Sequence, residues 1–236
     1  MKELLPTYLK NWLKRYAWFI VYHARFFSSA RKKNRNFVQS FIVGKPFPRN
    51  WNVFTKEGED GILLHLFLSI GTQNKQFVDI GSNDCINSNC ANLAFHHGWN
   101  GIFVDADSSA LKRGSAIYKA FFGSSVNRFC FTEAIITRDN AETLLTKTGC
   151  FTEPDLLCMD LDGNDYHIWQ AIELIRPRVV VTEIQIEKGL EEFIPPYENQ
   201  FEIYESKLPK GASISSMNRL AEKKRLYSNS NKFRRL

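Results

Sequence analysis

The sequence predicts an α/β fold with a Rossmann-like, doubly wound and mostly parallel sheet, and two observations support this prediction. From Asp60 onward, short apolar runs alternate with helical stretches, which is the pattern of successive βαβ units. Of the 236 residues, 44% are hydrophobic, so the chain can bury one complete core. This composition excludes a disordered, collagenous or small disulfide-stapled protein.

Five strands are predicted from apolar runs, at residues 76–80, 101–105, 129–136, 155–160 and 178–183. Helical patterns follow them, at residues 90–98, 111–121, 141–147 and 166–174. The first of these helices is expected to stop at Gly98, because glycine commonly ends helices. A strand, a crossover and another strand, repeated along the chain, define the doubly wound sheet.

Charge divides the chain into three parts. Residues 1–36 carry nine Lys or Arg against one acid, and residues 207–236 carry nine against one, whereas residues 37–206 carry 13 basic and 23 acidic residues. No linker or repeat divides the middle. We therefore predict a domain over residues 37–225, with a basic amphipathic helical extension at 1–36 and a basic tail at 226–236. The basic ends either attract anionic partners or are solvated tails that only keep the chain soluble.

The extension is predicted to begin with an amphipathic helix over residues 5–27, with aromatic and aliphatic side chains on one side and Lys or Arg on the other. A second basic cluster follows at Arg31, Lys32, Lys33 and Arg35. Residues 5–35 therefore suit an anionic membrane surface, or else pack on the core or on a second subunit. The longest apolar run, at 16–27, is interrupted by His23 and Arg25, so no spanning helix is expected.

The cysteine pattern shows no CxxC pair and no histidine at zinc-finger spacing. The five are Cys85, Cys90, Cys130, Cys150 and Cys158. Their apolar neighbours predict reduced, buried thiols without a structural metal. The protein is accordingly expected in the cytoplasm, at the inner face of a membrane if the extension binds lipid.

Each predicted strand ends in an acidic residue. These residues are Asp79, Asp105, Glu133, Asp160 with Asp162, and Glu183. The carboxyl ends of parallel strands share one edge of the sheet, and doubly wound sheets bind ligands at that edge. A site rich in carboxylates is therefore predicted there, although acids such as Asp139 also serve as helix caps.

The turn after the first strand indicates the ligand. Gly81 lets the backbone turn sharply and lets a ligand approach closely. A pyrophosphate cofactor normally requires three glycines here, and Asp84 would repel its charge. A cationic, phosphate-free adenosyl ligand suits this turn better, with Asp105 accepting hydrogen bonds from both ribose hydroxyls. That ligand is S-adenosylmethionine.

These residues resemble the FkbM-like family of class I S-adenosylmethionine-dependent methyltransferases. The resemblance runs from about residue 58 to 220 and rests on five segments, FVDIGSND at 77–84, GWNGIFVD at 98–105, DLLCMDLDGNDY at 155–166, PRVVVTE at 177–183 and GAS at 211–213. It implies a seven-stranded sheet and O-methylation of a hydroxyl, often on a sugar or polyketide. Cys85 stands where the family usually has glycine, so its side chain is expected to crowd a tight cofactor loop. Residues 227–236 lack the expected final apolar strand.

The resemblance also implies roles for individual positions. By position, the methionine-side loop comprises Asp79, Gly81, Ser82 and Asn83. Asp105 would contact ribose, Glu133 and Ala134 would lie near adenine, and Asp160 would form the floor between cofactor and substrate. The predicted acceptor is a hydroxyl of a sugar, glycan or glycolipid.

Methyl transfer to a hydroxyl needs a base to take the proton. The candidates for catalysis are Asp160, Asp162, His167 and Glu183. His167 has an equally good interpretation as a partly buried structural histidine. The three carboxylates among these candidates, those of Asp160, Asp162 and Glu183, offer oxygen ligands suited to Mg²⁺. A metal is not favoured, because oxygen-ligand sites have no characteristic sequence spacing that could be tested.

Two other functions remain open from the sequence. The first is a catalytically inactive methyltransferase-like protein that binds a membrane or partner through its basic ends. The second is an RNA methyltransferase that uses residues 223–225 and 232–235 with Tyr227 and Phe233 to stack on bases. The acidic middle makes nucleic acid a poorer partner. The sequence does not determine the oligomeric state.

Overall fold

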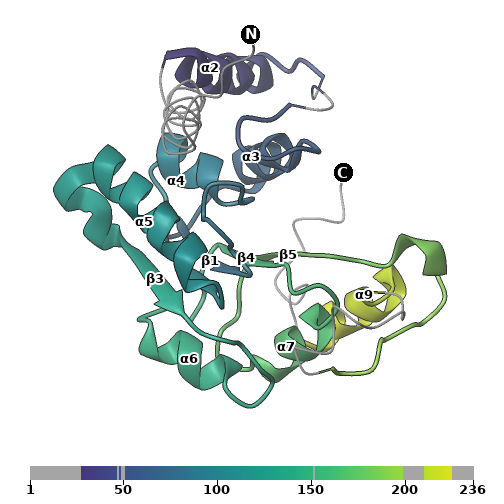
Figure 1. Ribbon diagram of the computed structural model, residues 1–236. Helices are drawn as coiled ribbons and strands as arrows, with labels where there is room; N and C mark the ends of the chain where they lie inside the picture. The colour runs from purple at the N-terminus through teal and green to yellow at the C-terminus, as the bar shows by residue number, and fades with distance from the viewer. Residues whose placement is uncertain (1–27, 47, 49–50, 151, 199–209, 225–236) are drawn as a thin grey trace, which may run out of the picture.

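The computed structural model describes residues 28–46, 48, 51–150, 152–198 and 210–224, and these residues form an α/β fold (Figure 1). The strands are β1 (Gln76–Ile80), β2 (Asn100–Asp105), β3 (Phe129–Glu133), β4 (Leu156–Met159) and β5 (Val179–Thr182). They pair in parallel in the order β3-β2-β1-β4-β5, so the order reverses between β1 and β4. The predicted doubly wound, parallel sheet is confirmed, and its switch point lies beside β1.

Helices cover both faces of the sheet (Figure 1). One face carries α3 (Glu59–Ile70), α4 (Ala91–His97) and α5 (Ser108–Phe122). The other carries α6 (Ala141–Lys147), α7 (Asp165–Ala171) and α9 (Ile214–Lys223). Short 3₁₀ helices lie at η1 (Gly123–Arg128) and η2 (Ile186–Lys188). Within the described part of the chain, no helix is long and apolar enough to cross a bilayer.

Side chains alternate along β1 between two hydrophobic cores. Phe77 belongs to the core under α3, α4 and α5, whereas Val78 and Ile80 belong to the core under α6, α7 and α9. All five residues of β1 are buried, as expected of a central strand covered on both faces. This alternation directs the side chain of Asp79 toward the first core.

Several predicted boundaries were too long at the carboxyl end. β3 ends at Glu133, β5 at Thr182 and α7 at Ala171, short of the predicted 136, 183 and 174. After β3 the side chain of Asn140 bonds to Ile135 O and Thr137 N, which folds residues 135–140 into a loop. The described residues hold five strands rather than the seven that the resemblance implies, and a single parallel bridge between Ile184 and Ala212 follows β5.

The second basic cluster lies on helix α2 (Ser28–Ile42), which packs on the domain. The amides of Asn34 and Asn92 bond reciprocally at 3.1 and 3.2 Å, and His97 Nε2 lies 2.6 Å from Asn34 Oδ1. Phe37 packs on Trp51 with ring centroids 4.7 Å apart. The predicted boundary between residues 36 and 37 thus falls inside a packed helix. The predicted helix at 5–27 and tail at 226–236 lie outside the described residues.

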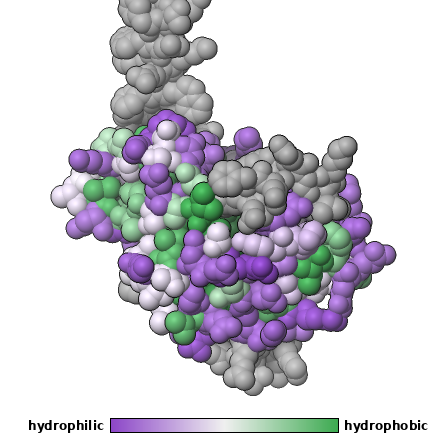
Figure 2. Space-filling model, turned by 60° about the horizontal axis from the view of Figure 1, so that its bottom comes forward, coloured by the Kyte–Doolittle hydropathy of each residue, from purple (hydrophilic) through white to green (hydrophobic). Residues whose placement is uncertain are grey.

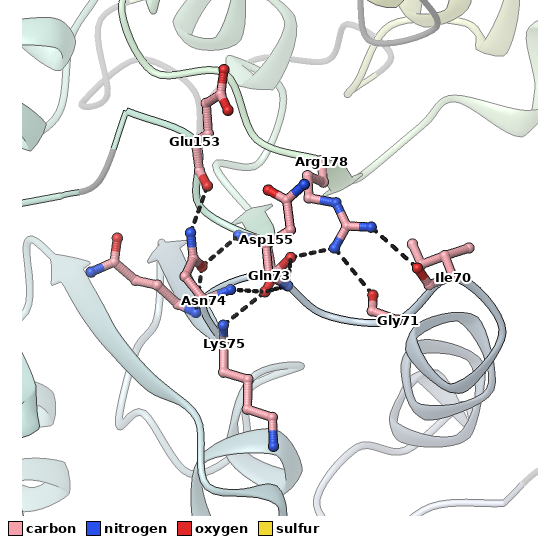
Figure 3. Close-up of polar contacts among 9 residues, drawn as sticks. Ile70, Gly71, Gln73, Asn74, Lys75, Glu153, Asp155 and Arg178 are labelled. Atoms are coloured by element: carbon pink, nitrogen blue, oxygen red, sulfur yellow. Dashed lines mark hydrogen bonds and ion pairs between the residues drawn. The ribbon is translucent and has the colours of Figure 1, made fainter. Parts of the chain in front are cut away.

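A buried carboxylate ties the start of the sheet together at its amino edge (Figure 3). Asp155, just before β4, accepts backbone N–H bonds from Gln73, Asn74 and Lys75 at 2.7–3.0 Å. Arg178 Nη1 donates to the same carboxylate at 2.5 Å. Burial alone would raise the pKa of Asp155, but Arg178 and the three N–H groups together hold it below its ordinary value. The loop before β1 is therefore fixed to β4 and β5.

Candidate functional site

The predicted glycine turn lies between β2 and β4, directly after β1. Gly81 N donates to Val104 O at 2.9 Å, and Asp160 N donates to Ile80 O at 3.0 Å. Gly81 has φ of +78°, and a Cβ at this position would lie 1.9 Å from the carbonyl oxygen of Asp160. Only glycine fits this turn, because both its backbone conformation and its distance from Asp160 exclude a side chain.

The segment after Gly81 does not enter a helix at once, because α4 begins only at Ala91. Between them the chain folds on itself, and Asp84 Oδ1 accepts hydrogen bonds from Ile86 N at 3.0 Å and Asn87 N at 2.9 Å. A pyrophosphate site in this fold places a helix amino terminus against the glycine turn. The geometry at Gly81 lacks that feature and favours a ligand without a diphosphate.

Asp105 ends β2 beside this turn. Its carboxylate accepts Asn83 N at 2.6 Å through Oδ2 and Asp107 N at 2.7 Å through Oδ1. The carboxylate is thereby held in one orientation and half-buried. An ionised carboxylate offers about four acceptor positions, so roughly two remain for a ligand such as a vicinal diol.

Ala134 and Glu133 lie on the far side of Asp105 from the turn. Glu133 pairs with Asp105 in the β2–β3 register, and Ala134 N donates to Asp105 O at 2.9 Å. The Glu133 side chain is exposed. The predicted loop, ribose and adenine residues therefore follow one another along one edge of the sheet. Their contact with a cofactor stays a prediction.

Asp79 is buried behind the turn and is poorly supported as an anion. Its Oδ2 accepts the Ser88 hydroxyl at 2.5 Å. Burial raises its pKa to about 7; the Ser88 bond opposes this rise, and the charges of Asp160 and Asp105 add to it. A cationic group bound nearby would favour the ionised form of Asp79.

Carboxylates also gather at the ends of β4 and β5. Partial burial and then the charge of Asp162 raise the pKa of Asp160. Burial, followed by the charges of Asp160, Asp165 and Asp162, raises the pKa of Glu183, which Lys210 opposes. Both groups are therefore better proton acceptors than ordinary carboxylates. Asp162 has a positive φ of 52° and forms an ion pair with Lys210 at 3.3 Å.

Asp165 is a member of this group that sequence reasoning missed. It is fully buried at the start of α7, and Thr182 Oγ1 donates to it at 3.2 Å. Its position in the sequence is that of an ordinary first-turn helix acid, so only the packing of α7 against β5 reveals it. Among the residues that the structure describes, no three His, Cys, Asp or Glu side chains are placed to hold a metal ion.

His167 is held by a loop rather than left open. Its Nε2 lies 2.7 Å from the carbonyl oxygen of Pro195, so this nitrogen carries the proton and donates it. The imidazole lies between the rings of Tyr166 and Tyr197, each 5.6 Å away between centroids. These contacts support the structural interpretation of His167, which anchors the segment around residue 195 to α7.

The side chain of Cys85 does not crowd the turn, contrary to what its position suggested. Cys85 is 0% exposed and lies in the core under α5, where Tyr118 Oη donates to its carbonyl at 3.1 Å. Its φ is +59°, a backbone conformation that glycine adopts more readily than other residues. Burial raises the pKa of its thiol beyond the usual range, so it stays protonated.

Comparison with known proteins gives little further information. No protein-family model matches the sequence, and no curated protein matches it. Among solved structures, the chain is similar to a precorrin-6y C5,15-methyltransferase from Geobacter metallireducens, with 14% identity and a TM-score of 0.40 over 60% of this chain and 69% of that one. A likeness at this level does not bear on the activity of the chain.

Proposed function

We propose that the protein is an S-adenosylmethionine-dependent methyltransferase of the FkbM-like type. One observation carries the proposal: Asp105 lies directly beside a turn that only Gly81 can form, and the next described helix, α4, begins only at Ala91. Asp105 suits a ribose diol, and the absence of a phosphate cradle suits an adenosyl group without a diphosphate. Asp79 supplies negative charge behind the turn for a cationic ligand.

The acceptor we propose is a hydroxyl of a sugar, glycan or glycolipid. When bound, S-adenosylmethionine supplies a methyl group on a positively charged sulfur. The backbone of Asp160 lies against Gly81, and its carboxylate is close enough to Asp162 for their charges to interact, which supports an acceptor site beside the cofactor site. We assign proton removal from the acceptor hydroxyl to Glu183 or Asp160, whose raised pKa values suit a base. The Pro195 bond occupies Nε2 of His167, which supports a structural role for this residue instead.

Thermal unfolding with and without ligand tests the cofactor. S-adenosylmethionine or S-adenosylhomocysteine at 100 times its Kd should add about 2.7 kcal/mol to the free energy of unfolding. Asp105→Asn keeps one oxygen for the backbone donors but should remove most of the shift, because a ribose hydrogen bond to a charged group is worth about 1.5–3 kcal/mol. Glu222→Ala, which removes an exposed acid on α9, should leave the shift unchanged.

Other outcomes separate the alternatives. A shift with NAD in place of the adenosyl ligands contradicts the proposal. A folded sample that shows no shift at millimolar ligand supports the catalytically inactive interpretation. Binding of RNA that weakens steeply with salt supports the nucleic-acid interpretation.

We also propose that the amino-terminal region meets an anionic membrane surface. The exposed side chains of Arg31, Lys32 and Arg35 on α2, which carries no acid, support this proposal. Flotation with vesicles that contain anionic lipid, compared with neutral vesicles, tests it. Equal flotation with both kinds of vesicle, or with neither, contradicts it.

A further inference from the structure

We propose that a second site lies between α7, α9 and the loop before β5, and that it binds a small anionic amphiphile, meaning an apolar body with a carboxylate or phosphate head. The hollow there has a volume of about 320 Å³. Its loop residues precede β5, so it lies at the amino edge of the sheet, opposite the Gly81 turn. It is therefore separate from the proposed methyltransferase site.

The walls of this hollow combine apolar and polar surface. Trp169, Ile172, Ile175 and Leu220 contribute to the lining, together with Pro177. All of these side chains except that of Pro177 belong to the core under α7 and α9, which fixes the shape of the hollow. Its volume is at the lower end of the range for small-molecule pockets, about 300–1,000 Å³, so it suits a short chain or a single ring.

The opening carries more positive than negative charge. Arg176, Lys223 and Lys224 line it against one acid, Glu173. Arg176 and Lys223 are exposed, and within the described residues their side chains form no ion pair. This charge contrasts with residues 37–206, which carry ten more acids than bases. The head group of a bound molecule is therefore expected to be an anion.

Lys224 is the cation best placed to meet that head. Its Nζ donates to Gln170 O at 3.1 Å and Ile172 O at 2.5 Å, which closes the carboxyl end of α7. An ammonium has three donors, so one remains. Lys224 is half-buried, and burial lowers its pKa, although the charges of Glu173 and Glu142 oppose this change. A further anion would stabilise its charged form.

Two acids of the described chain, Glu173 and Glu142, already act on Lys224 and raise its pKa. Residues 225–236 follow Lys224 directly, but their side chains include four Lys or Arg and no acid. Figure 2 turns the lower side of Figure 1 toward the viewer and shows hydrophilic side chains around small, separate apolar areas. Such a surface suits a small bound molecule better than a broad apolar partner.

Titration calorimetry on the full chain with four eight-carbon probes tests the proposal. Octanoate and octyl phosphate should bind, octanol should bind at least tenfold more weakly, and octylammonium should not bind. Binding of only one of the two anions identifies the head group and still supports the site. Equal affinity for octanoate and octanol, or no binding of either anion, overturns the proposal.

Charge reversal localises the binding. Arg176→Glu/Lys223→Glu should weaken octanoate binding at least tenfold, because both exposed cations at the opening become anions. The matched control, Lys112→Glu/Lys119→Glu on α5, makes the same charge change elsewhere and should have no effect. An equal loss in both double variants, or no loss in either, overturns the assignment to this hollow. The thermal shift with S-adenosylhomocysteine should persist in every variant, so failure here is distinguishable from failure of the proposed function.

Discussion

Two buried aspartates lie at opposite edges of the central strands, and they differ in how they are paired. Asp155, at the amino edge, accepts three backbone N–H groups and Arg178, and its pKa lies below the ordinary value. Asp79, at the carboxyl edge, accepts the hydroxyl of Ser88 and has a pKa of about 7. The same buried side chain therefore has a pKa that is raised at one edge and lowered at the other.

This difference separates a structural carboxylate from one that, under the proposed function, would support a bound cationic ligand. The protein satisfies Asp155 completely, so its charge stabilises the fold. Asp79 has fewer donors, and within the described residues only the Ser88 hydroxyl is seen to bond to it, so a positive group bound nearby would favour its ionised form. Poorly supported buried charges gather at functional sites, which agrees with the position of Asp79 behind the Gly81 turn.

The largest effect should come from Asp155→Ala. This change leaves three N–H groups and Arg178 without their acceptor, so we expect a loss of about 3–5 kcal/mol in the free energy of unfolding. Urea denaturation at neutral pH measures it. Glu153→Ala, an exposed acid two residues earlier, should change the free energy by less than about 0.5 kcal/mol. Similar losses in both variants would contradict the stabilising role of the Asp155 carboxylate.

A smaller effect of opposite sign is expected at Asp79. Because its folded pKa lies above its unfolded value of 3.8, its contribution to stability is full below pH 4 and is lost as pH rises through about 7. Asp79→Asn does not titrate, so it should be more stable than the natural chain by about 2–4 kcal/mol at pH 8 and equal to it at pH 4. Urea midpoints across this range measure the difference. A constant difference at all pH values would show that the charge of Asp79 is not involved.

The smallest effect concerns His97, which titrates in the same range. Burial, with His96 and Lys75 nearby, lowers its pKa to about 4, so its contribution is full above the unfolded value of 6.5 and is lost as pH falls toward 4. His97→Gln retains a donor for Asn34. Its gain in the free energy of unfolding over the natural chain should be about 1–3 kcal/mol larger at pH 4.5 than at pH 7.5. Comparing the double variant Asp79→Asn/His97→Gln with the two single variants separates the contributions of Asp79 and His97 to the pH dependence of the free energy of unfolding. A pH profile unchanged by the histidine substitution would contradict its buried, neutral state.

Local patterns were enough to predict the strands, the turn and the position of Asp105 at the end of β2. Alternating apolar runs record burial on both faces of the sheet, and a single glycine before a polar stretch marks a sharp turn. These signals lie within a few residues of the feature that they predict. The predicted ends of helices and strands were less accurate, because side chains such as Asn140 redirect the backbone after β3.

The contacts that the sequence did not predict join distant residues. Asp155 meets Gln73 across 82 positions and Arg178 across 23, and no local pattern encodes those pairings. The Pro195 bond to His167 and the burial of Asp165 likewise depend on how loops pack on α7. Cys85 shows the same limit, since its position suggested a crowded turn while its φ turns the side chain into the core.

The packing of α2 also decides where the chain can be shortened. A truncated protein that starts at residue 37 would lose Asn34 and leave the Asn92 amide and His97 Nε2 without their buried partner. It would also begin in the middle of a helix turn at Phe37, which covers Trp51. A protein that starts at Ser28 retains every one of these contacts, so crystallisation trials and deletion studies of the basic extension should place their cut before α2.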